Sequence, residues 1–438
     1  MTPTTIALIS RLELQDLSTP LVATITDVKQ LSSYSWIEAP SPTIAVPGTP
    51  PLWSAPSGPR QLKKDSGLIY IAQNAARHPD SPLEPLFRAL CITNPSFDIR
   101  SIDVVTDRNN IRKLLSFINP SMTRNGLETF TINIEVTKNT AIFCRDETTT
   151  HEFIGPDEFR GYGREFERVY TTRQIGASTG HHRIITYCFG GLNFVVRHET
   201  DGYVDTDTRI PSPDAKGPES DSLSSMLGSL TLSPTNGPPI TTPGSKLTIK
   251  KEGQMISLKS TLELKTRVFH KRIEIHEVAP QLWISQTPKL VRAYHRRGTF
   301  PVPEVEDVAA DIKIWEEGNQ SDLRKLAPLI SRIIGAVKGF GGNAIVKYDL
   351  LGDKLVIRKV DRKKMLPNDL YSMWDDRADS EAPSDNDVAA VKPINGIESK
   401  ADGKSAVFSP EGTKGRHESA TNRERCPPRK EDLLGVLN

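Results

Sequence analysis

A strand-rich stretch in the middle of the chain most limits the folds open to it. Residues 182–204 read HRIITYCFGGLNFVVRHETDGYV, two runs of β-branched and aromatic residues joined at Gly190-Gly191. Such runs on either side of a glycine pair predict a β-hairpin. The stretch therefore argues against an all-helical bundle and requires a sheet near the centre of the fold.

The rest of the chain mixes strand and helix patterns. Alternating or β-branched runs predict strands, and apolar residues spaced by three and four predict helices. The strand patterns occupy 129–146, 247–269 and 344–360, and the helical patterns occupy 81–118, 156–174 and 312–339. Together they predict an α+β fold, a twisted mixed β-sheet flanked by helices.

Composition indicates that part of the chain lies outside the packed core. Hydrophobic residues make up 37% of the sequence, and the 33 prolines cluster. Segments poor in apolar residues cannot bury enough surface to offset the entropy of ordering. We therefore expect an N-terminal lead-in over 1–30, one domain over 31–374 with a low-complexity, disordered insert at 206–247, and a disordered tail over 375–438.

Charge, cysteines and hydropathy exclude several classes of protein. The net charge of +2 is too small for a uniformly basic nucleic-acid binder, although a local basic channel is compatible with it. The four cysteines have no CxxC spacing, so neither a zinc site nor a disulfide framework is indicated. No apolar run is long enough to span a bilayer. We expect a soluble protein without a membrane partner, located in the nucleus or, as the alternative, the cytoplasm.

Three acidic motifs follow one another along the chain. Glu167 ends the helical motif GREFE, Glu199 and Asp201 form ETD at a strand end, and Glu263 and Lys265 lie in the strand STLELKTRV. Residues i and i+2 of a strand share one face, so each strand presents its two charges together. If the two strands are neighbours, three carboxylates and one ammonium converge, and Glu167 completes the group.

Carboxylates held this close repel one another, and a divalent cation relieves the repulsion. Oxygen ligands suit Mg²⁺ or Mn²⁺. A bound metal lowers the pKa of water and stabilises charge on a phosphoryl oxygen, while a lysine acts as a point charge. The pattern is typical of metal-assisted hydrolysis of phosphodiesters or phosphoanhydrides.

Each motif alone is weak, because ExD and ExK occur by chance and most such charges form surface ion pairs. Their order and context add weight. FVV precedes Glu199, and Leu262 and Leu264 flank Glu263. Charges on an otherwise apolar strand need a partner or a metal.

The series GREFE, ETD, LELKT and WISQTPKLVRAYHRRGTF resembles the DXO family of decapping nucleases. The resemblance runs in order over about 30–365 and implies a PD-(D/E)XK nuclease-like sheet flanked by helices. It implies catalytic roles for Glu167, Glu199, Asp201, Glu263 and Lys265, with Glu167, Asp201 and Glu263 as metal ligands. Upstream, DVVTDRNNIRKLL is similar to the family's first motif.

The same resemblance implies that Arg108 and Gln286 contact RNA. It implies a Mg²⁺- or Mn²⁺-dependent hydrolase of RNA 5′ ends, a decapping or pyrophosphohydrolase activity, together with 5′-to-3′ exonuclease activity in some members. It also implies a 5′-to-3′ exoribonuclease as a protein partner.

Two other readings stay open on the sequence. The first is a catalytically silent relative that keeps the fold and stabilises an exoribonuclease. The second is a prenyl-diphosphate enzyme, because Asp375–Asp379 match a DDxxD pattern, but that reading requires the all-helical bundle that the strand-rich middle opposes. His181 and His182 form a further pair of possible metal ligands, for which no third ligand has suitable spacing.

Overall fold

The computed structural model describes residues 4–15, 17, 19–122, 126–205 and 238–375. Most of the expected disordered insert and all but the first residue of the expected tail lie outside these residues. The DDxxD pattern lies outside them as well, except for Asp375.

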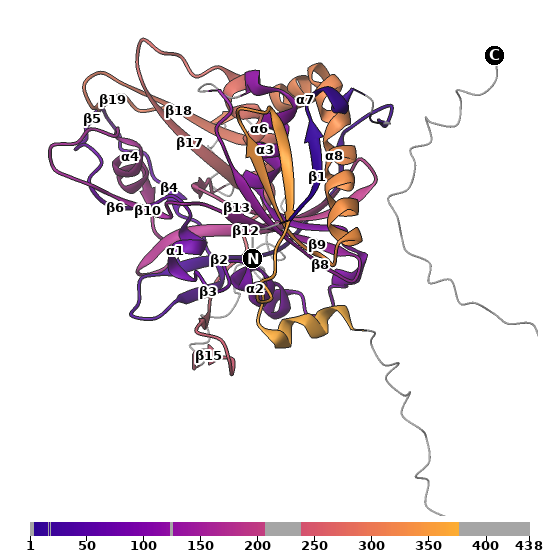
Figure 1. Ribbon diagram of the computed structural model, residues 1–438. Helices are drawn as coiled ribbons and strands as arrows, with labels where there is room; N and C mark the ends of the chain where they lie inside the picture. The colour runs from indigo at the N-terminus through magenta and orange to yellow at the C-terminus, as the bar shows by residue number, and fades with distance from the viewer. Residues whose placement is uncertain (1–3, 16, 18, 123–125, 206–237, 376–438) are drawn as a thin grey trace, which may run out of the picture. The chain divides into compact units, whose positions relative to one another are not determined.

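A mixed sheet of twelve strands, counted over the described residues, forms the centre of the fold (Figure 1). Three adjacent strands in its middle, β9, β7 and β13, run parallel, and most of the other pairs are antiparallel. In spatial order the strands are β1 (Thr5–Ser10), β22 (Lys354–Lys359), β21 (Asn343–Asp349), β8 (Thr131–Thr137), β9 (Thr140–Asp146), β7 (Val104–Asp107), β13 (Leu192–Glu199), β12 (Ser178–Phe189), β2 (Ile25–Ile37), β3 (Thr43–Gly48), β16 (Thr248–Gly253) and β15 (Ile240–Thr241).

Both faces of the central strands β9, β7 and β13 are buried, which explains their near-continuous apolar runs. Successive side chains of a strand point to opposite faces. Accordingly, Val104 and Val196 enter one apolar cluster, whereas their neighbours Val105 and Val195 enter another. The hairpin of β12 and β13 turns at Gly190 and Gly191 with φ of 57° and 81°, as the sequence predicts.

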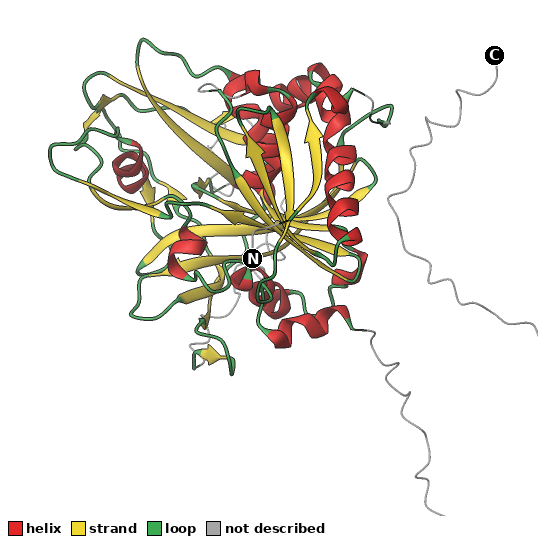
Figure 2. Ribbon diagram, viewed as in Figure 1, coloured by secondary structure: helices red, strands yellow, loops and turns green. Residues whose placement is uncertain are grey.

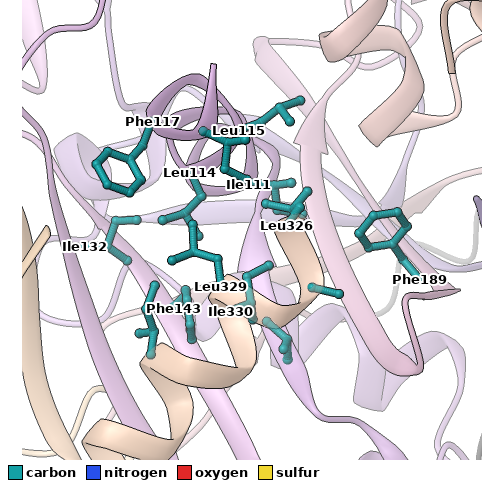
Figure 3. Close-up of a cluster of buried hydrophobic side chains, with 14 of the residues drawn as sticks. Ile111, Leu114, Leu115, Phe117, Ile132, Phe143, Phe189, Leu326, Leu329 and Ile330 are labelled. Atoms are coloured by element: carbon teal, nitrogen blue, oxygen red, sulfur yellow. The ribbon is translucent and has the colours of Figure 1, made fainter. Parts of the chain in front are cut away.

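Within the described part of the chain, four helices cover the first face: α3 (Arg108–Ile118), α6 (Ile275–Ser285), α7 (Ala309–Gly318) and α8 (Gln320–Gly339) (Figure 2). Figure 3 shows Ile111 and Leu114 of α3 and Leu329 and Ile330 of α8 packed against Ile132 of β8 and Phe143 of β9. These side chains recur at helical spacing on one side of α3 and α8, so each helix buries a single stripe.

The opposite face is covered by α2 (Glu84–Thr93) and the 3₁₀ helix η5 (Asn368–Trp374). Leu86, Phe87 and Leu90 of α2 are fully buried there, together with Trp36 of β2. The described part of the chain thus forms the mixed sheet flanked by helices that the sequence predicts.

A second mixed sheet has six strands among the residues described: β11 (Thr171–Thr172), β4 (Leu52–Trp53), β14 (Gly202–Tyr203), β17 (Thr261–Val268), β18 (Lys289–His295) and β20 (Glu306–Asp307). β17 and β18 are parallel, and α6 connects them. Helix α4 (Gly163–Tyr170) packs on this sheet, and α1 (Gln73–Arg77) is a short helix. Two small ladders join β6 (Gly67–Tyr70) to β10 (His151–Ile154) and β5 (Arg60–Gln61) to β19 (Thr299–Phe300).

Several expected boundaries are wrong. The first 30 residues are not a lead-in, because β1 pairs with β22 and β2 begins at Ile25 inside the large sheet. The insert ends before residue 247, because Ile240 and Thr241 already pair with β16.

Two predicted helices also differ from the structure. α4 begins at Gly163 rather than near residue 156, and the expected helix over 312–339 is divided into α7 and α8 at Asn319. The Asn319 side chain donates to the Trp315 carbonyl, 2.7 Å away, which helps end α7. Across the described residues, every helix is too short or too polar to cross a membrane.

Candidate active site

The predicted acidic residues meet where the two sheets join. Glu199 ends β13 of the large sheet. After Thr200 and Asp201 the chain enters β14 of the second sheet, where Gly202 pairs with Leu262. The expectation that the strands of Glu199 and Glu263 are direct neighbours in one sheet is wrong. The acids converge nonetheless, because the turn through Asp201 carries the chain from one sheet to the other beside β17.

One open cavity of about 880 Å³ is lined by all five predicted catalytic residues. Arg108, Arg164 and Gln281 also line it. These lining side chains come from three helices, α3, α4 and α6, and from the strands β13 and β17 and the turn that follows β13. The site therefore depends on the packing of both sheets. The predicted members are Glu167, Glu199, Asp201, Glu263 and Lys265.

Strand β17 separates its charged and apolar side chains by simple alternation. Leu262 and Leu264 are buried in the apolar cluster beneath the second sheet. Glu263 and Lys265 point to the other face and line the cavity. Glu263 is only 3% exposed, so its charge requires compensation from neighbouring groups.

Three neighbours supply that compensation. Lys265 Nζ lies 2.5 Å from Glu263 Oε1, Arg108 Nη1 lies 3.3 Å from Oε2, and the Gln281 amide donates to Oε1. Burial alone would raise the pKa of Glu263, but Lys265 and Arg108 outweigh it and lower the pKa to about 2. Glu263 is therefore an anion throughout the physiological pH range.

Two of the other carboxylates, Asp201 and Glu167, have raised pKa values instead. Burial and the nearby charges of Glu263 and Glu167 raise the pKa of Asp201 well above its usual value, although Asp201 Oδ2 accepts the Leu264 N–H at 2.8 Å. Burial, opposed by Arg164 and reinforced by Glu199, raises the pKa of Glu167 to about 7. Both acids bind their protons more tightly because the nearby positive charges do not offset burial and the repulsion from neighbouring carboxylates.

Helix α4 presents Glu167 through its packing. Phe166 and Tyr170, four residues apart, are fully buried and stack with ring centroids 4.1 Å apart. The Asp65 carboxylate accepts the Glu165 N–H at 3.0 Å and so satisfies a free donor in the first turn. With Phe166 fixed in the core, its neighbour Glu167 turns to the cavity.

The structure places Gln286, for which the resemblance implies an RNA contact, outside the lining of the acidic cavity. Gln286 ends α6 with φ of 53°, donates to the Trp283 carbonyl and does not line the acidic cavity. Gln281 lies five residues earlier, which places it about 140° around the helix from Gln286. Gln281, not Gln286, contacts Glu263.

Arg164 is a site residue that the acidic motifs do not identify. It lies three residues before Glu167 on α4, and its Nη1 is 3.4 Å from Glu167 Oε2. Its guanidinium also interacts electrostatically with Glu199 and Asp201. The i, i+3 spacing in GREFE was the available signal, since such residues are neighbours on a helix.

The donor set fits a divalent cation in its chemistry. The ligands available are the carboxylate oxygens that Mg²⁺ and Mn²⁺ prefer, from Glu167, Glu199, Asp201 and Glu263. The pKa values of Glu167 and Asp201 are raised, and a bound cation would stabilise their ionised forms. Within the described residues, no three Asp, Glu, His or Cys side chains are grouped tightly enough to hold an ion as they stand. Lys265, Arg108 and Arg164 balance the acids instead.

A larger groove of about 930 Å³ adjoins the acidic cavity, and the two share Glu167, Glu199 and Asp201 in their linings. Its wall includes the cations Arg164, Arg168 and Arg173 and the aromatic ring of Tyr70. Arginines and aromatic rings along a groove are the groups that hold a single nucleic-acid strand.

His181 and His182, the pair of possible metal ligands, lie in strand β12. Both are buried, and burial lowers their pKa values well below the usual range. His182 stacks on Tyr34 with ring centroids 5.1 Å apart, and His181 Nδ1 lies 3.0 Å from Ser35 Oγ. They belong to no metal-ligand group among the residues described.

Comparison with known proteins relates these features to one family. Residues 4–374 match the family model described as a domain of unknown function, DUF8563. No curated protein matches the sequence. Among solved structures, the chain is similar to Rai1 of Scheffersomyces stipitis in complex with (3'-NADP)+ and calcium ion, with a TM-score of 0.51, 12% identity and coverage of 85% of this chain and 99% of that chain.

It is also similar to Candida albicans Rai1 in complex with pU5-Mn2+, with a TM-score of 0.52, 12% identity and coverage of 84% and 99% of the respective chains. Rai1 belongs to the DXO family, so the expected fold resemblance is confirmed. The chain is a member of the DUF8563 family, built on the fold of the DXO-family protein Rai1.

Proposed function

We propose that the protein is a divalent-metal-dependent hydrolase that acts on the 5′ ends of RNA, as a decapping enzyme or pyrophosphohydrolase. The observation that carries the proposal is the meeting of four carboxylates and one ammonium from α4, β17 and the junction between the two sheets. Buried acids with raised pKa values at a cavity are characteristic of functional sites.

In this proposal Glu167, Asp201 and Glu263 hold the metal, and Glu199 completes its surroundings. When bound, the metal activates water and stabilises charge on the phosphoryl oxygen. Lys265 and Arg108 already lie at Glu263, where their charges would stabilise a phosphate brought to the acids. The adjoining groove, with Arg164, Arg168 and Arg173, would bind the strand that follows the 5′ end.

The solved relatives support the chemical class of ligand. One Rai1 structure contains pU5 and Mn2+, and another contains (3'-NADP)+ and calcium ion. Those ligands combine a phosphate with a divalent cation, the pair that the acids and arginines of this cavity suit.

The test is hydrolysis of RNAs that carry a 5′ triphosphate, an unmethylated cap or a 5′ monophosphate, each with Mn²⁺, Mg²⁺ or EDTA. We expect metal-dependent release of the 5′ group by the full chain and a loss of at least about 100-fold in Glu263→Ala, because several of the charges at the site depend on Glu263. Glu13→Gln is the control, since Glu13 pairs with Arg332 at the surface, away from the cavity. Absence of turnover with every RNA and metal would contradict the proposal.

A catalytically silent protein that binds an exoribonuclease is the second candidate. The observation in its favour is that internal cations already balance the acids, and no tight ligand group exists among the described residues. Metal binding separates the two candidates. If Mn²⁺ leaves the melting temperature of the wild type unchanged, and the protein instead accelerates an added 5′-to-3′ exoribonuclease, the silent role is correct.

A further inference from the structure

A second, smaller cavity lies beside the acidic one, at the carboxyl ends of three parallel strands. It has a volume of about 210 Å³, and Arg108 and Glu199 line both cavities. The strands β9, β7 and β13 end here, bringing Arg145, Asp107 and Arg197 to its wall. The crevice outside the carboxyl ends of parallel strands is a general location for ligands in open sheets.

The lining of this cavity is predominantly basic. Four arginines face two carboxylates, Asp107 and Glu199. Arg197 binds both oxygens of Asp107, at 2.6 and 3.0 Å, so these two charges cancel. Arg145 pairs with Glu147 and Arg108 with Glu263, two carboxylates outside the lining of this cavity. The Arg112 side chain forms no hydrogen bond or ion pair with the described residues, and desolvation lowers its pKa, with a further contribution from the positive charge of Arg108.

The N-terminus of α3 also opens on this cavity. The helix begins at Arg108, and Asp107 precedes it without a side-chain cap, because its carboxylate binds Arg197. The first N–H groups of a helix without such a cap attract anions. Arg108, Asn109 and Arg112 of the first two turns line the cavity.

Two buried histidines that line the cavity each have a ring nitrogen without a hydrogen-bond partner among the described residues. His182 and His198 line the cavity and are 5% and 3% exposed, yet Nδ1 of each has no partner among the described side chains and backbone. An unsatisfied buried ring nitrogen costs free energy unless a ligand or water meets it. The cavity thus combines the unpaired guanidinium of Arg112, the N-terminus of α3 and two imidazole nitrogens without a partner among the described residues.

We infer that this cavity binds a phosphate group. Its volume is below the roughly 300 Å³ at which sites for drug-sized molecules begin, so it suits a phosphate or diphosphate rather than a whole nucleotide. Because it shares Arg108 and Glu199 with the acidic cavity, its natural occupant is the outer phosphate of an RNA 5′ end whose inner phosphate lies at the acids. That assignment to RNA rests on the proposed function, whereas the binding of phosphate does not.

Inorganic phosphate tests the site directly. It is titrated calorimetrically into the full chain in EDTA, with sodium chloride of equal ionic strength as the reference. We expect saturable binding that Arg112→Gln weakens about tenfold, the effect of losing one charge-assisted hydrogen bond. Arg112 is exposed and unpaired, so its replacement leaves folding intact, and the exposed Arg358 on β22 provides the control Arg358→Gln.

Equal dissociation constants for the wild type and Arg112→Gln, or a response matched by chloride, would overturn the site. A second arm compares binding of the same oligonucleotide with a 5′ triphosphate and with a 5′ hydroxyl. We expect the triphosphate to bind at least about tenfold more tightly, and this preference to shrink in Arg112→Gln. Equal binding of the two ends would overturn the assignment to the RNA end.

Failure of this inference is distinguishable from failure of the proposed function. Phosphate binding that depends on Arg112 in a protein without hydrolytic activity would retain the site and reject the hydrolase. Hydrolysis by the wild type, with the same phosphate affinity in the wild type and in Arg112→Gln, would retain the hydrolase and reject the phosphate site. We expect Glu167→Gln to lose hydrolysis and keep phosphate binding, since Glu167 does not line the smaller cavity.

Discussion

Glu167 and Glu263 show how surroundings give one residue type two different acidities. Glu263 lies between Lys265 and Arg108, and its pKa falls to about 2. Glu167 is also desolvated, but its charged neighbours include Glu199, and its pKa rises to about 7. Within one cavity, Glu263 thus provides a permanent charge, while the charge of Glu167 depends on pH.

The raised pKa of Glu167 predicts a pH-dependent stability of the metal-free protein. A carboxyl that binds its proton more tightly in the folded state stabilises the fold below its unfolded pKa, and this contribution is lost as pH rises toward about 7. Glu167→Gln mimics the protonated form, so in EDTA we expect it to be more stable than the wild type at pH 8, by about 1 kcal/mol, since the side chain is partly exposed and screened.

The measurement is urea unfolding of both proteins at pH 8 and pH 5. The difference should nearly vanish at pH 5, where Glu167 in the wild type carries its proton. A stabilisation of equal size at both pH values would show that the change acts through packing rather than through the charge.

The two glutamines of α6 give a matched pair of variants. Gln281→Ala removes a donor from buried Glu263, and leaving the oxygen less well satisfied should reduce kcat/KM for RNA hydrolysis about tenfold. Gln286→Ala removes only a bond to the Trp283 carbonyl at the helix end, and kcat/KM should stay within about twofold of the wild type. A larger loss in Gln286→Ala than in Gln281→Ala would restore the sequence-based choice.

At the scale of elements, α4 couples the apolar core to the catalytic acids. Phe166 lies 5.0 Å from Phe300 and 4.1 Å from Tyr170, measured between ring centroids, and is fully buried. Glu167 follows it directly, so the position of the acid depends on the anchoring of its neighbour.

Phe166→Ala should therefore lower both stability and activity. Loss of a fully buried phenylalanine costs about 3–5 kcal/mol, and the freed helix would no longer hold Glu167 at the cavity. Urea unfolding measures the first effect, and hydrolysis at a temperature where the variant stays folded measures the second. Phe153→Ala is the control, because Phe153 of β10 is 69% exposed and its loss should change stability by less than about 0.5 kcal/mol.

The sequence predicts these elements better than it predicts their partners. Alternation in STLELKTRV places Glu263 and Lys265 on one face correctly, and the glycine pair at 190–191 locates the hairpin, because both signals are local. The pairing of β14 with β17 is not local. It depends on a turn at Thr200 and Asp201 that passes between two sheets, and a periodic pattern contains no information on which sheet a strand joins.

Helix register decides which side chains of a recognised helix face the site. GREFE and the helix before β18 were recognisable, but the choice between Gln281 and Gln286 depends on which stripe of α6 meets β17. The acidic motifs do not identify Arg164, although its i, i+3 spacing to Glu167 predicts a contact between the two on a helix. Motifs therefore locate the elements of this site, and tertiary packing selects the side chains.

At the scale of the whole molecule, residues distant in sequence complete the large sheet and cover its faces. β1 from the N-terminus pairs with β22, and η5, the last described element, covers the face opposite α3 and α8. Without α2 and η5 the sheet would expose one of its apolar faces, because side chains from β2 to η5, among them Tyr34 and Trp374, form one buried cluster on that face. The DUF8563 match ends at residue 374, where this packing ends.

That packing predicts a sharp difference between two shortened chains. A chain ending at residue 375 keeps η5, whereas one ending at 367 loses Leu370 and Trp374, which are 3% and 1% exposed, and the Trp374 bond to Thr140. It also leaves the buried Arg88 without Asp369, its partner at 3.1 Å. Removing one large buried side chain costs about 3–5 kcal/mol, so the shorter chain should be at least that much less stable in urea than the longer one. Equal midpoints for the two chains would mean that η5 lies on the sheet without stabilising it, and that the second apolar face is covered by α2 alone.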